Sequence, residues 1–132
     1  AGEDEALARS TIAWIRDMER RGAANLLARL AGAFLASAAR LVAEAGVAVE
    51  AGDGVALRAA LHTLRSSSGA IGALPLSERC AALEAQARDE QFAQVRSAWP
   101  AFLDQYGCAV GALKALCESA EAVPEPAGAL TP

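Results

Sequence analysis

Apolar residues recur at steps of three and four along almost the whole chain of 132 residues. One such series is Leu27, Leu30, Phe34, Ala38, Leu41 and Ala45, and a second is Leu76, Cys80, Leu83 and Ala87. This spacing places the apolar side chains on one face of an α-helix, whereas a half-buried strand requires strict alternation. Alanine and leucine also outnumber the β-branched residues that strands favour. The pattern therefore predicts an all-α protein.

Turn and capping residues divide the pattern into separate helices. A short amphipathic segment, with Ile15 or Trp14 on its apolar side, should end near Gly22. A longer helix carries the series from Leu27 to Ala45, and the sequence AGDG then interrupts it. Asp53 is well placed as the N-cap of the next helix, which should run from about Val55 to Ile71.

Two more helices follow. Residues 76–87 mark the fourth, and the last should begin near Asp89 with Phe92, Val95, Trp99, Phe102, Tyr106, Val110, Leu113 and Cys117 at nearly heptad spacing. Pro100 lies inside this helix and should bend or break it, because proline has no N–H group to donate. The predicted architecture is an antiparallel four-helix bundle with one additional short N-terminal helix.

The length fits one domain, and the composition of the two ends suggests its limits. The acidic opening has no core pattern, so residues 1–7 are predicted to be a linker. The ending EAVPEPAGALTP contains three prolines and cannot continue a helix, so residues 119–132 are predicted to be a flexible tail. The bundle should occupy residues 8–118.

Charge and composition exclude several classes of function. The net charge is −4, from 12 basic and 16 acidic residues, so no basic stripe indicates nucleic-acid binding. Charges interrupt segments such as VAEAGVAVEAG before the ~20 apolar residues that a membrane span needs, and no leader pattern opens the sequence. We therefore expect a soluble, cytoplasmic protein without direct membrane insertion.

The three cysteines occupy helical core spacings. Cys80, Cys108 and Cys117 form no CxxC pair, and their odd number leaves one unpaired in any disulfide scheme. They are predicted to be reduced packing residues, with no disulfide and no metal site.

His62 is the chain's one histidine. At 100° per residue it points about 160–180° away from the apolar stripe of its helix and therefore faces solvent. Its face is shared by two arginines and by residues with small or apolar side chains, namely Val55, Arg58, Ala59, Arg65, Ser66 and Gly69. Ser66 and Gly69 together cost roughly 1–1.5 kcal/mol of helix propensity relative to alanine. This cost suggests that the small side chains leave room for a bulky partner. The alternative is that His62 is a surface histidine without a function.

The segment HTLRSSSGAIGALPLSERCAALE, His62 to Glu84, resembles the signature of the histidine-containing phosphotransfer (HPt) domain family. The preceding stretch, ending in Gly-Asp, is similar to the family's preceding helix, so the resemblance covers most of residues 20–118. It implies a four-helix bundle whose exposed histidine accepts a phosphoryl group from the aspartyl phosphate of a receiver domain and passes it to another receiver. It also implies that the receiver supplies the Mg²⁺ and that this chain needs no cofactor of its own.

The family's functional positions carry over one at a time. The phosphorylated histidine corresponds to His62. The basic residue three positions later, lysine in most members, is Arg65, and the small residue after it, usually glycine, is Ser66. The polar residue that holds the imidazole from the next helix corresponds to Glu84, and a basic residue one turn further on is Arg88.

Three other roles of the histidine compete with phosphotransfer. Ser66, Ser67 and Ser68 suggest a Ser-His catalytic pair, but Ser67 and Ser68 fall on the buried side of the helix and no nucleophile turn is present. One histidine cannot make a metal or haem site in a bundle. A helical protein-docking module in which His62 is not phosphorylated remains the alternative function. The acidic and proline-rich margins favour a domain of a hybrid sensor histidine kinase, tethered to the inner membrane through that chain, over a free-standing carrier.

Overall fold

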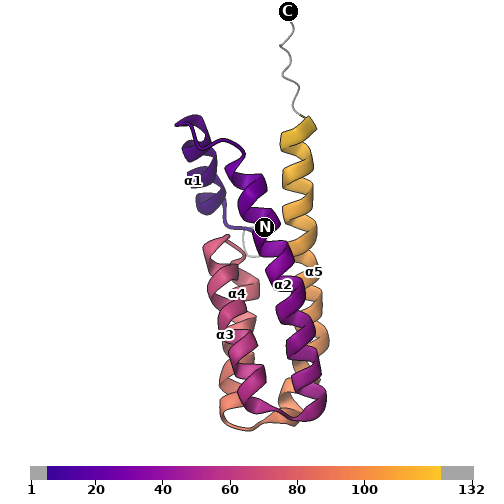
Figure 1. The fold of residues 1–132 in the computed structure, drawn as a ribbon. Helices are drawn as coiled ribbons and strands as arrows, with labels where there is room; N and C mark the ends of the chain where they lie inside the picture. Colours follow the sequence, from indigo (N-terminus) through magenta and orange to yellow (C-terminus); the bar gives the residue numbers. More distant parts are fainter. Residues whose placement is uncertain (1–5, 123–132) are drawn as a thin grey trace, which may run out of the picture.

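The computed structural model describes residues 6–122, and within them it contains five α-helices and no strand. They are α1 (Arg9–Arg20), α2 (Leu26–Ala51), α3 (Gly54–Ala70), α4 (Leu74–Arg88) and α5 (Phe92–Ala122). The four long helices run alternately down and up the bundle, and α1 lies beside the upper part of α2, beyond the end of α3 and α4 (Figure 1). The expected all-α bundle with an additional short N-terminal helix is confirmed.

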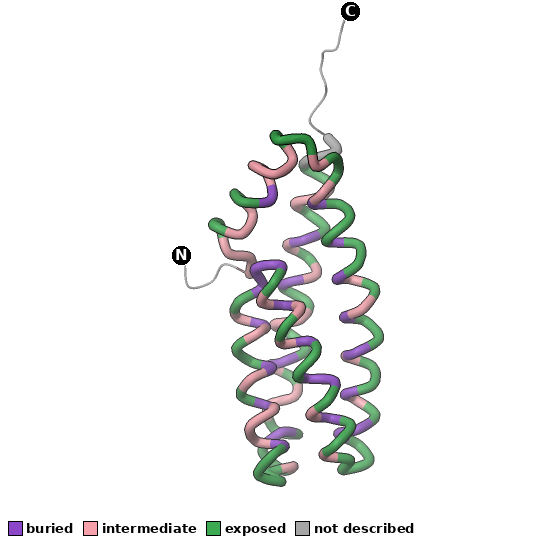
Figure 2. Tube along the Cα trace, turned by 60° about the vertical axis from the view of Figure 1, so that its left-hand side comes forward, coloured by how far each residue is buried: buried purple, intermediate pink, exposed green. Residues whose placement is uncertain are grey.

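Each long helix buries one stripe of small and aliphatic side chains. The buried residues lie on the inward side of each helix (Figure 2), and α2 packs on α3, α3 on α4, α4 on α5 and α5 on α2. The core includes Phe34, Leu41, Leu57, Leu61, Leu64, Leu76, Cys80, Leu83, Val95, Phe102 and Leu113. These positions follow the predicted spacing.

The phase of the buried stripe differs from the prediction in α2 and in α5, and in α1 it decides between two candidates. Ile15 is buried while Trp14 is exposed, which settles the choice left open for α1. Leu30 is exposed and Ala31 is buried, and Ala109 replaces Val110 in the core. A one-residue shift of this kind arises because the 3.6-residue helical repeat drifts around a long helix relative to a strict heptad.

Capping contacts fix the turn that begins α3. Gly52 ends α2 with a φ of 68°, and the Asp53 carboxylate accepts a hydrogen bond from the Ala56 N–H at 3.1 Å, as an N-cap does. Arg96 of α5 donates to the Val49 carbonyl at 3.2 Å and so satisfies an acceptor in the last turn of α2.

The start and interior of α5 differ from the prediction. The helix begins at Phe92 rather than near Asp89, because Asp89 is the C-cap of α4 and Glu90 adopts a positive φ of 60°. It then passes through Pro100 without a break. Pro100 and Arg96, whose carbonyl the proline leaves without an intrahelical donor, are both exposed, so water can satisfy that carbonyl.

The predicted domain limits are only partly covered by the described residues. Helix α5 continues to Ala122, four residues beyond the limit expected at 118. Leu7, at the end of the predicted linker, packs against the core. Residues 1–5 and 123–132, which make up most of the predicted linker and tail, lie outside the described residues.

Helix α2 is long and apolar enough to cross a membrane by length and composition alone. The expectation that charges interrupt every such stretch therefore fails for α2. The buried core helix of a soluble protein passes the same test. In α2, 28% of the apolar window is buried, and the helix buries eight residues, among them Leu27, Phe34 and Leu41.

Hydrogen bonds connect both ends of the α1 segment to the bundle. The Ala8 N–H donates to the Gly72 carbonyl at 2.7 Å, in the turn between α3 and α4. The Glu19 carboxylate accepts from the Leu27 N–H at 2.9 Å and so caps the start of α2. This backbone hydrogen bond is the main reason that the pKa of Glu19 is lowered.

The turn at Gly72 offers a direct test of this attachment. Gly72 has a φ of 86°, and a Cβ there would lie 2.8 Å from the Thr11 Cβ of α1. Gly72→Ala should therefore destabilise the protein by at least about 1–2 kcal/mol, measured by chemical denaturation. In the control, Gly107→Ala, the new methyl group meets no atom within 4 Å, so helix propensity should stabilise the protein by about 0.5–1 kcal/mol. Equal stabilities of the Gly72 variant and the parent would contradict the packing of α1 on this turn.

Candidate functional site

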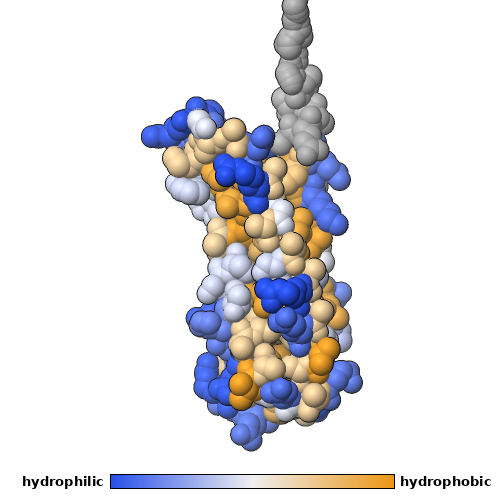
Figure 3. Space-filling model, viewed as in Figure 1, coloured by the Kyte–Doolittle hydropathy of each residue, from blue (hydrophilic) through white to orange (hydrophobic). Residues whose placement is uncertain are grey.

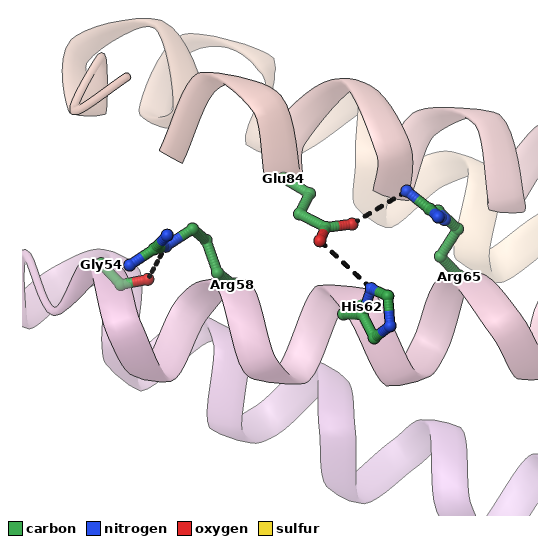
Figure 4. A network of polar contacts seen from close by, with 5 residues as sticks. All are labelled: Gly54, Arg58, His62, Arg65 and Glu84. Atoms are coloured by element: carbon green, nitrogen blue, oxygen red, sulfur yellow. Dashed lines mark hydrogen bonds and ion pairs between the residues drawn. The ribbon is translucent and has the colours of Figure 1, made fainter. Parts of the chain in front are cut away.

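His62 lies on the open side of α3, with 60% of its side chain exposed, and meets a carboxylate from the neighbouring helix. Its Nδ1 atom is 3.2 Å from Oε2 of Glu84 on α4 (Figure 4). The second oxygen of Glu84, Oε1, accepts a hydrogen bond from Nη1 of Arg65 at 3.2 Å. The three side chains predicted to form the centre of the site are thus brought together.

The contact assigns the imidazole's tautomer. A carboxylate can only accept a hydrogen bond, so the proton of a neutral His62 is assigned to Nδ1. Nε2 then carries the lone pair, on the side of the ring away from Glu84. The arrangement can present a nucleophilic nitrogen to a group that approaches the exposed face of α3.

Packing of α3 on α4 positions Glu84. Cys80, one turn before it, and Leu83, next to it, are both buried, so Glu84 lies at the edge of the buried stripe with 13% of its side chain exposed. Burial and the negative charge of Glu84 raise the pKa of the Cys80 thiol to about 12, although Arg65 opposes this. Cys80 is therefore a protonated packing residue beside the site. Cys117 is half-buried, whereas Cys108 is exposed, so the prediction that all three cysteines are packing residues is wrong for Cys108.

The face around His62 contains several of the expected small and apolar side chains. In the view of Figure 3, hydrophobic and hydrophilic areas alternate along the surface of the bundle. Val55 is 71% exposed, and Ala59 and Ser66 are also exposed. Ala59 borders a shallow groove between α2 and α3, lined by Arg40, Leu41, Glu44, Ala56, Ala59, Ala60 and Thr63. Ala59 and Thr63 are three residues before and one after His62, so the groove runs beside the histidine.

The two other arginines of the predicted site are not part of the contact network. The Arg58 side chain donates from Nε to the Gly54 carbonyl at 3.2 Å, along its own helix and toward the start of α3 (Figure 4). Arg88 is exposed in the last turn of α4, one turn beyond Glu84. Of the arginines predicted around His62, Arg65 is the one that contacts Glu84, the carboxylate beside the imidazole.

Gly69 lies at the contact between α3 and α4 and not on an open part of the surface. It is half-buried, and a Cβ at this position would lie 3.5 Å from the Ser77 Oγ of α4. The Ser77 hydroxyl donates to the Arg65 carbonyl at 2.9 Å. The sequence reasoning missed Ser77, and its place in the first turn of the helix that carries Glu84 is the signal that could have identified it.

Ser67 and Ser68 do not form a catalytic pair with His62. Ser67 donates to the Leu64 carbonyl at 3.2 Å, and Ser68 is fully buried in the core. Within residues 6–122, no group of three or more histidine, cysteine, aspartate or glutamate side chains is arranged to hold a metal ion.

The fold and the site define a class of protein, a helical bundle that presents one carboxylate-held histidine on an exposed helix face. The family model of the Hpt domain matches residues 29–123, which include most of α2, all of α3 to α5 and the whole site, while α1 precedes the match. No curated protein and no solved structure matches the chain. The chain belongs to the Hpt domain family, whose members function in phosphotransfer in two-component signalling and generally interact with receiver domains of response regulators.

Proposed function

We propose that this protein carries a phosphoryl group in a two-component phosphorelay. His62 accepts the group from the aspartyl phosphate of one receiver domain and passes it to the aspartate of another. The observation that carries the proposal is the contact of His62 Nδ1 with Glu84 at 3.2 Å, which leaves Nε2 as the exposed nucleophile.

The transfer needs no further reactant. The Nε2 lone pair attacks phosphorus, the bond from phosphorus to the aspartate oxygen breaks, and its electron pair leaves with the aspartate carboxylate. The imidazole keeps its Nδ1 proton and becomes positively charged when Nε2 bonds to phosphorus. Glu84, which faces that proton, stabilises the new charge.

Charge stabilisation around the phosphoryl group comes from both proteins. Phosphoryl transfer spreads negative charge over three equatorial oxygens and depends mainly on positioning and on nearby cations. We assign one of these cations to Arg65, three residues from His62 and 42% exposed. The receiver domain supplies the Mg²⁺, so this chain requires no cofactor.

The receiver would dock on the exposed side of α3. Val55 and Ala59 provide apolar surface beside His62, and the groove between α2 and α3 continues it. The Arg40–Glu44 ion pair at the groove is 3.2 Å long and mostly exposed, so it contributes little to stability and is available to a partner's charges. Small side chains here allow close approach to Nε2.

We place this activity in the cytoplasm of a bacterium, and the kinase domains of a hybrid sensor chain are the proposed second type of partner. In such a chain the domain would be tethered to the inner membrane through the parent kinase. The competing function is a helical docking module whose histidine is never phosphorylated.

Replacing the histidine tests the proposal. His62→Gln should abolish uptake of labelled phosphate from phosphorylated receiver domains, while the melting temperature stays within a few degrees of the parent value, because an exposed side chain contributes little to stability. A double variant, His62→Gln with Gln94→His, returns one imidazole to an exposed position of α5 and should stay inactive. Label on either variant would refute His62 as the phosphorylated residue, and a parent protein that no receiver labels would favour the docking module.

The docking surface has its own test. Ala59→Glu places a bulky negative charge beside His62 and should weaken binding of the receiver that labels the parent fastest by about tenfold, equivalent to ~1.4 kcal/mol, measured by titration. Ala93→Glu makes the same change at an exposed position of α5 and should leave the affinity unchanged. If both variants bind as the parent does, the receiver docks elsewhere.

A further inference from the structure

We infer that two copies of this chain associate through the edge of the bundle that α2 and α5 form. Six exposed, uncharged residues of α2 fall within an arc of about 100° at the helical repeat. They are Ala28, Gly32, Ala36, Ala39, Ala43 and Val47, and we call them the outer face of α2. The occupant of this face is a second copy, related to the first by a two-fold axis near Ser37.

The first argument is that α2 is more apolar than its burial requires. The helix is apolar enough to cross a membrane, yet only 28% of its apolar window is buried in the bundle. Of its charged residues, Arg40 and Glu44 line the groove toward α3, on the other side of the helix from α5. The outer face therefore runs for about 28 Å without a charge, and a contiguous apolar face marks an interaction site.

The second argument is that α5 extends this apolar surface. Val47 of α2 is 71% exposed and Leu103 of α5 is 41% exposed. The two helices adjoin here, since a Cβ at Gly46 would lie 4.0 Å from the Trp99 ring (Figure 1). Half-buried apolar side chains of both helices complete the edge, namely Leu35, Val42, Tyr106 and Val110. The exposed surface is thus two helices wide.

The size of the edge fits a weak dimer. Two adjacent helices are about 20 Å wide. Over the length of the outer face, a second copy would cover roughly 500–600 Å² of each chain, or about 1,000–1,200 Å² in total, which is near the lower limit for a specific interface. We therefore expect reversible association that depends on protein concentration.

The third argument is the spacing of the outer face, which is the same from both ends. Its six residues are separated by steps of four, four, three, four and four. In an antiparallel pair, Gly32 of one copy therefore lies level with Ala43 of the other, and Ala36 with Ala39. Val47, the largest side chain of the face, lies level with Ala28, one of the smaller ones. A surface with this symmetry can pair with its own copy about a two-fold axis.

Charges beside the outer face agree with the same register. Arg29 and Glu44 both lie on the side of the outer face that is turned away from α5. In the antiparallel pair, Arg29 of one copy is within two residues, about 3 Å along the helix axis, of the level of Glu44 of the other. The two-fold axis repeats this pairing of opposite charges at the other end. No charged residue of the face lies near the axis, where identical charges of the two copies would repel each other.

Association leaves the candidate site accessible in both copies. The contact of His62 with Glu84 joins α3 to α4, whereas α2 and α5 form the opposite edge of the bundle. The dimer can therefore be tested by itself, without any phosphate donor, and its failure would not affect the proposed function.

Sedimentation equilibrium over a range of protein concentrations provides the first test. The apparent mass of the parent should rise from 13.5 kDa toward twice that value, with a midpoint on the order of 10–100 μM. Ala39→Glu brings two carboxylates close to the two-fold axis and should weaken association at least about tenfold, equivalent to ~1.4 kcal/mol. Ala82→Glu makes the same change at an exposed position of α4 and should keep the parent value.

A parent that stays monomeric at every concentration overturns the inference. If that monomer also sediments with phosphatidylcholine vesicles, the outer face serves a lipid surface instead. Equal association of the Ala39 variant and the parent would likewise exclude this face as the interface.

Disulfide trapping tests the antiparallel register independently. Gly32→Cys and Ala43→Cys, each combined with Cys108→Ser to remove the exposed thiol, should form a linked dimer when the two proteins are mixed and oxidised. A Cβ at Gly32 meets no atom within 4 Å, so the new side chain fits. Each variant alone should link poorly, because identical positions lie about 16 Å apart along the pair, too far for a disulfide. Linkage of each variant with itself, or none in the mixture, would overturn the proposed pairing.

Discussion

The contact between α3 and α4 is the constraint on which the site depends. Leu61 and Leu64 of α3 and Leu76, Cys80 and Leu83 of α4 are all fully or almost fully buried, and their packing sets the register of the two helices. That register places Glu84 opposite the interval between His62 and Arg65. Because the carboxylate is carried by a packed helix rather than a loop, the histidine is oriented before any partner arrives.

Much of the fold could be predicted from spacing alone, since burial of one stripe per helix is what the three- and four-residue periodicity encodes. The Asp53 cap of α3 could be predicted as well, because capping depends on local chemistry. The predictions failed where tertiary context decides the outcome. Pro100 does not interrupt α5, because the proline lies at an exposed position of the helix. Ala31 is buried in place of Leu30, and this depends on how α2 is rotated against its neighbours.

The candidate site, like the fold, could be predicted from the sequence only in part. The helical angle predicts that His62 is exposed, and the family resemblance supplied Glu84 as its partner; both positions agree with the structure. Side-chain directions could not be predicted. Arg58 shares the face of His62 but bonds along its own helix, and Gly69 packs against Ser77. Arg65 contacts the carboxylate that was expected to hold the imidazole. Such contacts depend on rotamers and inter-helix register, which residue spacing does not contain.

Glu84 holds Nδ1 of His62, and we propose that Nε2 therefore receives the phosphoryl group. The most direct measurement is heteronuclear ³¹P–¹⁵N NMR of the protein after phosphorylation by a receiver domain, with the imidazole nitrogens labelled. We expect phosphorus to be coupled through one bond to Nε2 of His62, with the proton retained on Nδ1. Phosphorus bonded to Nδ1, or to any residue other than His62, would contradict it.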